Sequence, residues 1–169
     1  MSDSIAQLNQ MSQAEFVERL GAVFEETPTI ADQVWHQRPF ADVNDLHQKM
    51  TEIVNAMSQT DQLALIRAHP DLGTKAKMAE ASVQEQSGVG LDRLTAQDYA
   101  RFQFLNQAYK DQFGFPFIVA VKNHTQFSIL ETFERRLNNS LSTEMTQALL
   151  EISTIAHFRL VGLVESSTQ

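Results

Sequence analysis

The first candidate for chemistry is a histidine beside a rigid turn, His69 in the run His69-Pro70-Asp71-Leu72-Gly73. An imidazole titrates near neutral pH and Pro70 fixes the neighbouring backbone, which suits transfer of a proton to or from a bound substrate. The alternative is a histidine at a helix end that interacts only with the helix dipole, and for an arbitrary histidine this is the commoner situation. Both interpretations remain open on this motif alone.

A second candidate is the polar motif Ser82-x-x-Glu85-Gln86, which is followed by Gly88 and Gly90. Its spacing matches a capping box, in which a serine begins a helix and a glutamate three residues later bonds back to it. Gly88 and Gly90 disfavour a capping box here, because they leave little helix to cap. The amide of Gln86 offers donors and an acceptor that suit a heterocyclic ligand. The motif therefore indicates either a helix start or part of a binding pocket.

The third candidate is Arg159, which interrupts an apolar stripe near the end of the chain. At about 100° per residue, Arg159 points close to the mean direction of the apolar side chains of its helix. That stripe consists of Met145, Leu149, Ile152, Ile155, Ala156 and Leu163. A buried guanidinium needs a partner, either an internal carboxylate or an anionic ligand that it binds with two hydrogen bonds. Taken alone, the feature slightly favours the internal salt bridge.

Helices are expected to position all three candidates, because capping residues and apolar residues at helical spacing recur along the chain. The predicted fold is an all-α, single-domain bundle of about eight helices, covering residues 1–169. The helices are expected to begin at Ser12, Thr27-Pro28, Asp42, Thr60, about Lys75, Thr95, Thr125 and about Thr143. The run 115–121 looks like a strand by composition but has no second strand to pair with, so we expect one short extended segment there.

Several details of these helices can be checked directly. The first is expected to continue through Val23 and Phe24, and the fifth to span about 75–81, ahead of an irregular region. The sixth should end at Gly114, where a left-handed residue belongs. The seventh should bury the stripe made of Phe127, Leu130, Phe133 and Leu137.

Composition excludes several classes of function. The formal net charge is −8, which disfavours binding to nucleic acid. There is no cysteine, so disulfides, thiolate metal sites and a cysteine nucleophile are excluded, and the five histidines lack the spacing of a zinc site. Gly88-Val89-Gly90 lacks the third glycine of a dinucleotide fingerprint. No apolar run is long enough to span a membrane, and we expect a cytoplasmic protein.

Motifs in order along nearly the whole chain resemble one family, the 2-oxo-4-hydroxy-4-carboxy-5-ureidoimidazoline (OHCU) decarboxylases. They include Phe16 through Pro28, Arg38-Pro39-Phe40, Ala68 through Gly73, Ser82-x-x-Glu85-Gln86, Gly90-Leu91, Phe113 through Ile118, Arg136-Leu137-x-Asn139 and Arg159-Leu160. The resemblance implies a carboxy-lyase that converts OHCU to (S)-allantoin in urate and purine degradation. It also implies a homodimer with OHCU as its small-molecule ligand, no cofactor, no metal, and no nucleic-acid or membrane partner.

The resemblance also implies roles for individual residues. His69 would be the catalytic proton donor, with Glu85 as a second catalytic residue that either orients the imidazole or accepts a proton. The substrate would be bound by Pro70, Ser82, Val83, Gln84, Glu85, Gln86, Phe117, Ile118, Val119, Ala120, Val121 and Arg159. Two other classes of function remain open at this point. One is a helical module that binds a small ureide or purine product without turnover, and the other is an adaptor domain in which Arg159 forms only a structural ion pair.

Overall fold

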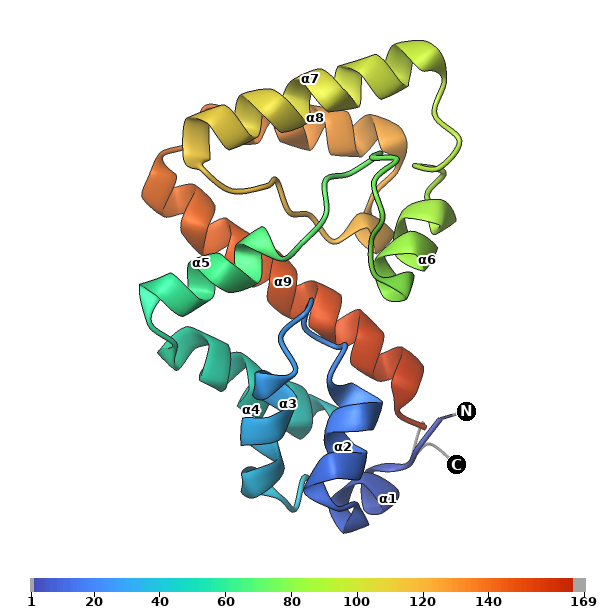
Figure 1. The fold of residues 1–169 in the computed structure, drawn as a ribbon, viewed down its shortest axis with the longest axis vertical. Coiled ribbons are helices and arrows are strands. Elements are labelled where there is room, and N and C mark those ends of the chain that lie inside the picture. Colours follow the sequence, from blue (N-terminus) through green and yellow to red (C-terminus); the bar gives the residue numbers. More distant parts are fainter. Residues whose placement is uncertain (1, 166–169) are drawn as a thin grey trace. The chain divides into compact units, whose positions relative to one another are not determined.

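The fold of the chain is all-α, as the sequence predicts (Figure 1). The structure is a computed structural model and describes residues 2–165. Across these residues there are nine α-helices and two 3₁₀ turns. They are α1 (Ile5–Gln10), α2 (Gln13–Leu20), α3 (Thr29–Val34), η1 (Trp35–Gln37), α4 (Val43–Ala56), α5 (Gln59–Arg67), α6 (Glu80–Gly88), α7 (Ala96–Phe113), η2 (Val121–Asn123), α8 (Gln126–Arg136) and α9 (Leu141–Leu163).

Three helix starts with a strong capping residue are where the sequence places them, whereas α5 begins at Gln59 and not at the predicted Thr60. Asp42, Thr95 and Thr125 are the N-caps of α4, α7 and α8, and each side chain accepts a hydrogen bond from the backbone N–H three residues later. Helix α7 ends at Gly114 with φ 79°, in the left-handed conformation that glycine adopts without strain. These boundaries are set by local hydrogen bonds, which is why the sequence reveals them.

Two predicted boundaries near the N-terminus are wrong. Helix α2 ends at Leu20, with Gly21 as its C-cap, so Val23 and Phe24 are buried but lie beyond the helix. Pro28 rather than Thr27 is the N-cap of α3, because the Thr27 hydroxyl donates to the Glu25 carbonyl instead of capping the helix. At Val23 and Phe24 the apolar pattern reflects burial, and burial does not require the helix to continue.

The region around α6 differs most from the prediction. Residues 75–79 are not helical, and α6 begins at Glu80 and runs through Gly88. The helix is closed by Gly90, whose φ is 79°, and by a hydrogen bond of 2.9 Å from the Leu91 N–H to the Gln86 carbonyl. Ser82 is therefore the third residue of this helix, so the capping-box interpretation of Ser82 and Glu85 is wrong.

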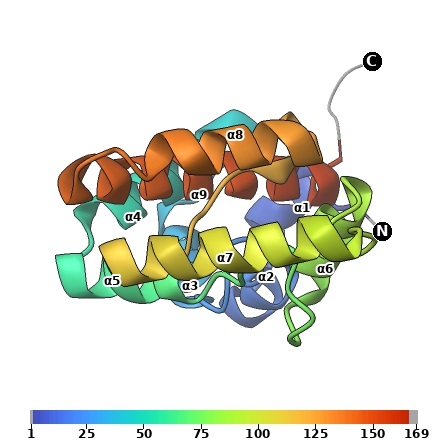
Figure 2. The same ribbon diagram turned by 90° about the horizontal axis from the view of Figure 1, so that it is seen from above.

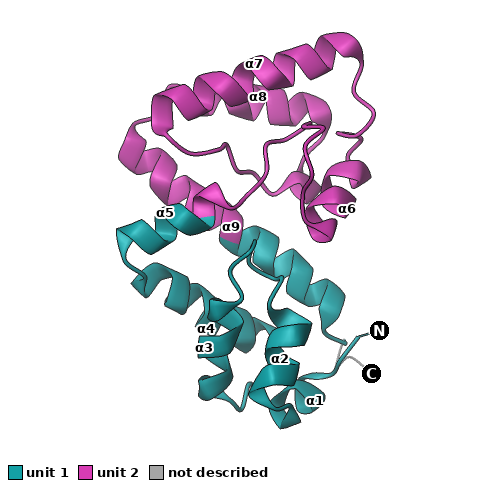
Figure 3. Cartoon of the chain, in the orientation of Figure 1, with its two compact units in different colours: residues 1–65, 153–169 teal, residues 66–152 magenta. Residues whose placement is uncertain are grey.

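The chain forms two compact units (Figure 3). Unit 1 is made of the described parts of Met1–Leu65 and Ser153–Gln169, and unit 2 is Ile66–Ile152. Helices α5 and α9 each begin in one unit and end in the other. The single-domain organisation over residues 1–169 stays a prediction.

Each unit, taken by itself, packs its helices around buried aromatic side chains. In unit 1, α3 packs against α2 and α4, and Phe16 stacks on Phe40. In unit 2, α7 and α8 lie side by side (Figures 1 and 2), joined by an aromatic cluster in which Phe117 stacks on Phe133 with ring centroids 3.8 Å apart. Within the described residues, no helix is both long and apolar enough to cross a membrane.

The buried faces of α8 and α9 are rotated relative to the predicted stripes. Helix α8 buries Ile129, Thr132, Phe133 and Arg136, whereas Phe127 is 71% exposed. Helix α9 buries Glu144, Ala148, Ile152, Ala156, Arg159 and Leu160. The prediction that Arg159 points inward is confirmed, while Leu163, expected in the same stripe, is exposed.

Candidate active site

His69 lies just beyond the end of α5, in unit 2. Its backbone N–H donates to the Ile66 carbonyl at 3.2 Å, which continues the helical turn past Arg67. The residue is 8% exposed. Pro70 follows and prevents further helix, as the sequence predicts. The imidazole is thus carried by a short buried turn rather than by a surface loop.

Gln86 of α6 holds this turn from one side. Its side-chain oxygen accepts from the Gly73 N–H at 3.0 Å, and its nitrogen donates to the Asp71 carbonyl at 3.2 Å. Gly73 has φ 69°, a conformation that favours glycine. Because Gln86 is buried, these two bonds satisfy main-chain groups that would otherwise be costly to bury.

Helix α7 holds the same turn from another side, with three polar side chains at positions i, i+3 and i+7 on one face. Two of them bond to main-chain oxygens and the third to a carboxylate. The contacts are Gln103 to the Gly73 oxygen (3.3 Å), Asn106 to the Leu72 oxygen (2.9 Å) and Lys110 to the Asp71 carboxylate (2.8 Å). The segment that follows His69 is therefore fixed by side chains of two helices.

The face of α6 that carries Gln86 also carries Ser82 and Glu85. Ser82 is 4% exposed, Gln86 is 6% exposed and Glu85 is partly buried. Residues at i, i+3 and i+4 share one side of a helix, so the link made by Gln86 brings this polar face to the His69 turn. Val83 and Gln84 lie on the opposite, exposed side of α6, so the structure does not bring their side chains to this face.

The segment Phe117–Val121 is buried along its whole length, and it contains no helix or strand before η2 begins at Val121, so the strand-like composition does not form a strand. The Arg136 guanidinium donates to the Ile118 carbonyl at 2.6 Å, and a Glu151 carboxylate oxygen accepts from the Ala120 N–H at 2.9 Å. Helix α6 packs against η2, which starts at Val121. Three of the predicted groups of site residues thus meet around α6 within unit 2.

Arg159 belongs to unit 1, where it has an internal carboxylate partner. Its Nη1 lies 3.2 Å from Glu25 Oε1, and it donates to the carbonyls of Ala22 and Val23 at 3.3 and 3.4 Å. Both side chains of the pair are almost fully buried. The internal salt bridge weighed in the sequence analysis is present, and recognition of substrate by Arg159 stays a prediction.

A buried polar network in unit 2 is absent from the sequence-based prediction. Glu144 Oε1 accepts from the Tyr109 hydroxyl at 2.6 Å and from Arg136 Nε at 2.8 Å, and its Oε2 accepts from Asn139 at 2.9 Å. Burial, followed by the bond to Glu144, raises the pKa of the Tyr109 phenol well above its ordinary value. The sequence does contain a signal for Arg136, because this polar residue occupies a position on the buried face of its helix. The same is true of Asn106 in α7, which is outside this network.

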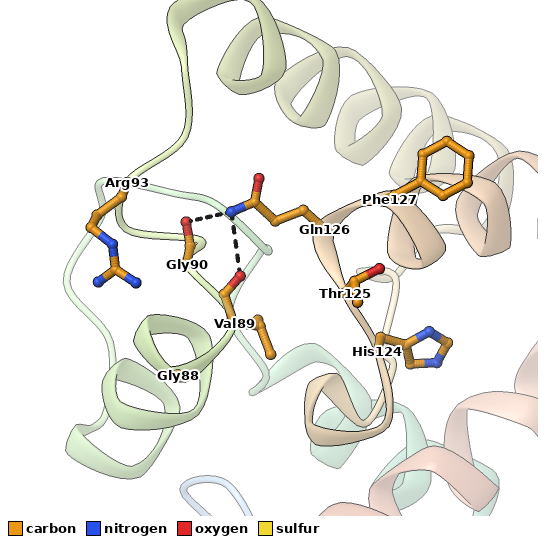
Figure 4. Close-up of a pocket in the computed structure, with 8 residues that line it drawn as sticks. All are labelled: Gly88, Val89, Gly90, Arg93, His124, Thr125, Gln126 and Phe127. Atoms are coloured by element: carbon orange, nitrogen blue, oxygen red, sulfur yellow. Dashed lines mark hydrogen bonds between the residues drawn. The ribbon is translucent and has the colours of Figure 1, made fainter.

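An open cavity of about 590 Å³ lies between the end of α6 and the start of α8 (Figure 4). The Gln126 amide reaches across it to the carbonyls of Val89 and Gly90, and Arg93 and Phe127 are on opposite sides. The described residues that line it include none of the predicted site residues. Across residues 2–165, no three His, Asp or Glu side chains converge closely enough to hold a metal ion.

Comparison with known proteins identifies the family of this chain. The sequence model described as OHCU decarboxylase matches residues 9–161. The OHCU decarboxylase of Halalkalicoccus jeotgali is 43% identical to this chain, over 95% of this chain and 91% of the relative. The chain belongs to the OHCU decarboxylase family. As a member of the OHCU decarboxylase family it is a carboxy-lyase of urate degradation.

Two further similarities extend across the same range. The uric acid degradation bifunctional protein PucL of Bacillus subtilis is 46% identical over 93% of this chain, which corresponds to 32% of that longer protein. A crystal structure of (S)-allantoin synthase has a TM-score of 0.80 at 29% identity and covers 97% of this chain and 55% of its own. The family match spans residues of both compact units.

Proposed function

We propose that this OHCU decarboxylase converts its substrate to (S)-allantoin with His69 as the proton donor. The observation that carries the proposal is the link made by Gln86. It joins the His69 turn to the helix face that bears Ser82 and Glu85. A buried imidazole on a turn fixed by two helices has the restricted orientation that delivery of a proton to one face of an intermediate requires.

The reaction requires a proton to be delivered to one face of a ring carbon. The carboxylate and a hydroxyl group sit on one ring carbon of OHCU, next to an imine carbon. When the bond to carbon dioxide breaks, its electron pair forms a double bond to the imine carbon, and the imine π electrons move to the ring nitrogen, which takes up a proton. The resulting enol becomes the ring amide carbonyl of allantoin when its hydroxyl loses a proton and the former imine carbon gains one. The face from which His69 delivers that last proton decides the configuration of allantoin.

The neighbouring residues have complementary roles in this proposal. Glu85 orients the imidazole or accepts the hydroxyl proton, while Pro70 and Ser82 line the pocket. Gln86 uses one donor and one acceptor site on the turn and keeps a second of each for the substrate. The main chain of Phe117–Val121 binds the amide and ureido groups of the substrate.

Arg159 is proposed to bind the substrate carboxylate or an adjacent carbonyl, in addition to its bond with Glu25. The support for this role is the family resemblance, together with the ability of a planar guanidinium to bind a carboxylate through two parallel hydrogen bonds. A homodimeric state and a cytoplasmic location are also proposed. Their support is the family resemblance and, for the location, the complete lack of cysteine in the sequence.

The test is to generate OHCU in situ from urate with the two preceding enzymes and to follow allantoin by circular dichroism. His69→Asn keeps a hydrogen-bonding group but cannot transfer the proton, so we expect formation of the S product to fall to the uncatalysed rate, with ligand binding retained. The matched control is His36→Asn, because His36 is exposed and lies in unit 1. A His69→Asn enzyme that still makes (S)-allantoin rapidly would remove His69 from the mechanism.

A further inference from the structure

The extended segment after α7 is held at two points by side chains from other helices. Arg136 of α8 donates to the carbonyl of Ile118, and Glu151 of α9 accepts from the N–H of Ala120. Both bonds are directed to the main chain of a segment that has no strand or helix of its own. They therefore fix the peptide groups on either side of Val119.

Val119 itself is the unusual residue of the segment. It is only 4% exposed, yet its main chain makes no hydrogen bond to any residue in the range 2–165. The great majority of buried backbone N–H and C=O groups in folded proteins are paired. The N–H and the carbonyl of Val119 belong to the two peptide groups that Arg136 and Glu151 hold, so both are fixed in position and left to pair with something other than this chain.

We propose that Arg136 and Glu151 are positioning residues, which hold the Val119 peptide groups in place to bind the amide and ureido groups of the substrate. The proposal rests on the assignment of Phe117–Val121 to substrate binding. A peptide group and a ureido group are complementary, because each presents an N–H donor beside a carbonyl acceptor. Fixing the peptide before the substrate arrives avoids the entropic cost of ordering it during binding.

The surroundings of Arg136 fit this role. Its guanidinium is fixed by the buried Glu144 carboxylate at 2.8 Å and lies over the Phe117 ring at 4.4 Å. A buried ion pair is weak evidence for stability, because desolvation offsets the attraction. The additional bond from Arg136 to the Ile118 carbonyl holds the peptide in place, and an apolar side chain at this position could not do this.

Glu151 gives the cleaner experiment, because its two carboxylate oxygens have different partners. Oε1 accepts from the Ala120 N–H at 2.9 Å, and Oε2 accepts from the Gln147 amide at 3.0 Å. Glu151→Gln keeps an acceptor at the same reach but removes the charge. Glu151→Asp keeps the charge but draws the acceptor back by one methylene. Gln147→Leu is the matched control, since it removes only the second contact.

The measurements are KM and kcat with OHCU generated in situ, together with the affinity for (S)-allantoin and the Val119 amide resonance in labelled protein. In Glu151→Asp we expect KM and the (S)-allantoin Kd to rise about tenfold, as misplacing one peptide hydrogen bond implies, with kcat changed less than about threefold. Glu151→Gln and Gln147→Leu should remain within about twofold of wild type in KM. Arg136→Lys, whose single nitrogen cannot reach both Glu144 and Ile118, should resemble Glu151→Asp.

The outcomes separate this inference from the site assignment on which it rests. If (S)-allantoin binds wild-type protein without moving the Val119 amide resonance, the segment is not part of the site, and the inference fails with that assignment. If the resonance moves but Glu151→Asp behaves like Gln147→Leu, the site assignment stands and the positioning role is overturned. A loss of affinity in Glu151→Gln with normal affinity in Glu151→Asp would show that charge, rather than the position of the peptide, is what Glu151 contributes.

Discussion

The ion pair between Arg159 and Glu25 allows the structural and the substrate-binding roles of Arg159 to be separated. At the 3.2 Å between Arg159 Nη1 and Glu25 Oε1, the attraction is roughly 5 kcal/mol at an effective dielectric constant of about 20, before desolvation is counted. Glu25→Gln retains an acceptor oxygen but leaves the guanidinium charge buried without its counter-charge. We expect it to lower the free energy of unfolding by about 3 kcal/mol. For a chain of this length that corresponds to a fall in Tm of roughly 6–12 °C.

The informative variant is the double replacement Glu25→Leu with Arg159→Met. Removing both charges and filling the space with apolar atoms typically costs little, so its stability should be within about 2 kcal/mol of wild type. A folded protein without the ion pair then reports on catalysis alone. If Arg159 binds the substrate, this variant melts normally but loses turnover of OHCU.

The assays are thermal unfolding followed by circular dichroism and turnover followed by formation of (S)-allantoin. Arg101→Met is the control for removing an arginine, since Arg101 pairs with Glu134 at the surface and should change the free energy of unfolding by less than about 1 kcal/mol. Turnover at the wild-type rate in the double variant would refute the substrate-binding role and leave Arg159 with a purely structural one.

Two further predictions concern other polar groups. Burial, with a smaller contribution from the neighbouring His157, lowers the pKa of His47. Below about pH 6.5 the unfolded chain therefore binds more protons at this residue than the folded protein does. On acidification from that pH, the free energy of unfolding should fall by at most about 1.4 kcal/mol per pH unit, and His47→Gln should reduce this dependence in urea titrations. Asn106→Leu should lower kcat by about tenfold while leaving Tm within a few degrees, because it releases the Leu72 carbonyl behind His69 and also removes an unpaired side-chain oxygen. Gln107→Leu, on the exposed side of the same helix, is its control. Equal kcat in the two variants would show that the turn at residues 69–73 keeps its conformation without the Asn106 bond.

The parts of the fold that the sequence predicted are those decided within a few residues. The N-caps Asp42, Thr95 and Thr125 and the terminating Gly114 are all used as expected, because each makes its bond to a backbone group three or four residues away. Helix α6 was misplaced for the opposite reason. Its N-cap, Ala79, makes no side-chain hydrogen bond, so its start has no local signature.

The candidate site shows the same division. Arg159 was recognised as inward-pointing from helical periodicity, but its partner Glu25 lies 134 residues away in the sequence and no local pattern connects them. The burial of Ser82 and Gln86 was likewise hidden, because α6 has almost no apolar stripe and is oriented by bonds to the turn at 71–73. The family resemblance supplied these residues where periodicity could not.

Four polar side chains of unit 2 act in the same way, which explains how the irregular segments of the candidate site are held. Gln86, Asn106, Arg136 and Glu151 each bond to the main chain of a segment that lacks regular secondary structure. Such segments cannot satisfy their own peptide groups, so burying them requires donors and acceptors from the surrounding helices. The mechanism proposed above relies on preorganised main-chain and imidazole groups, since positioning supplies much of the rate enhancement in it. The polar residues that interrupt the apolar faces of α7 and α8 therefore serve the two segments between the helices more than the packing of the helices themselves.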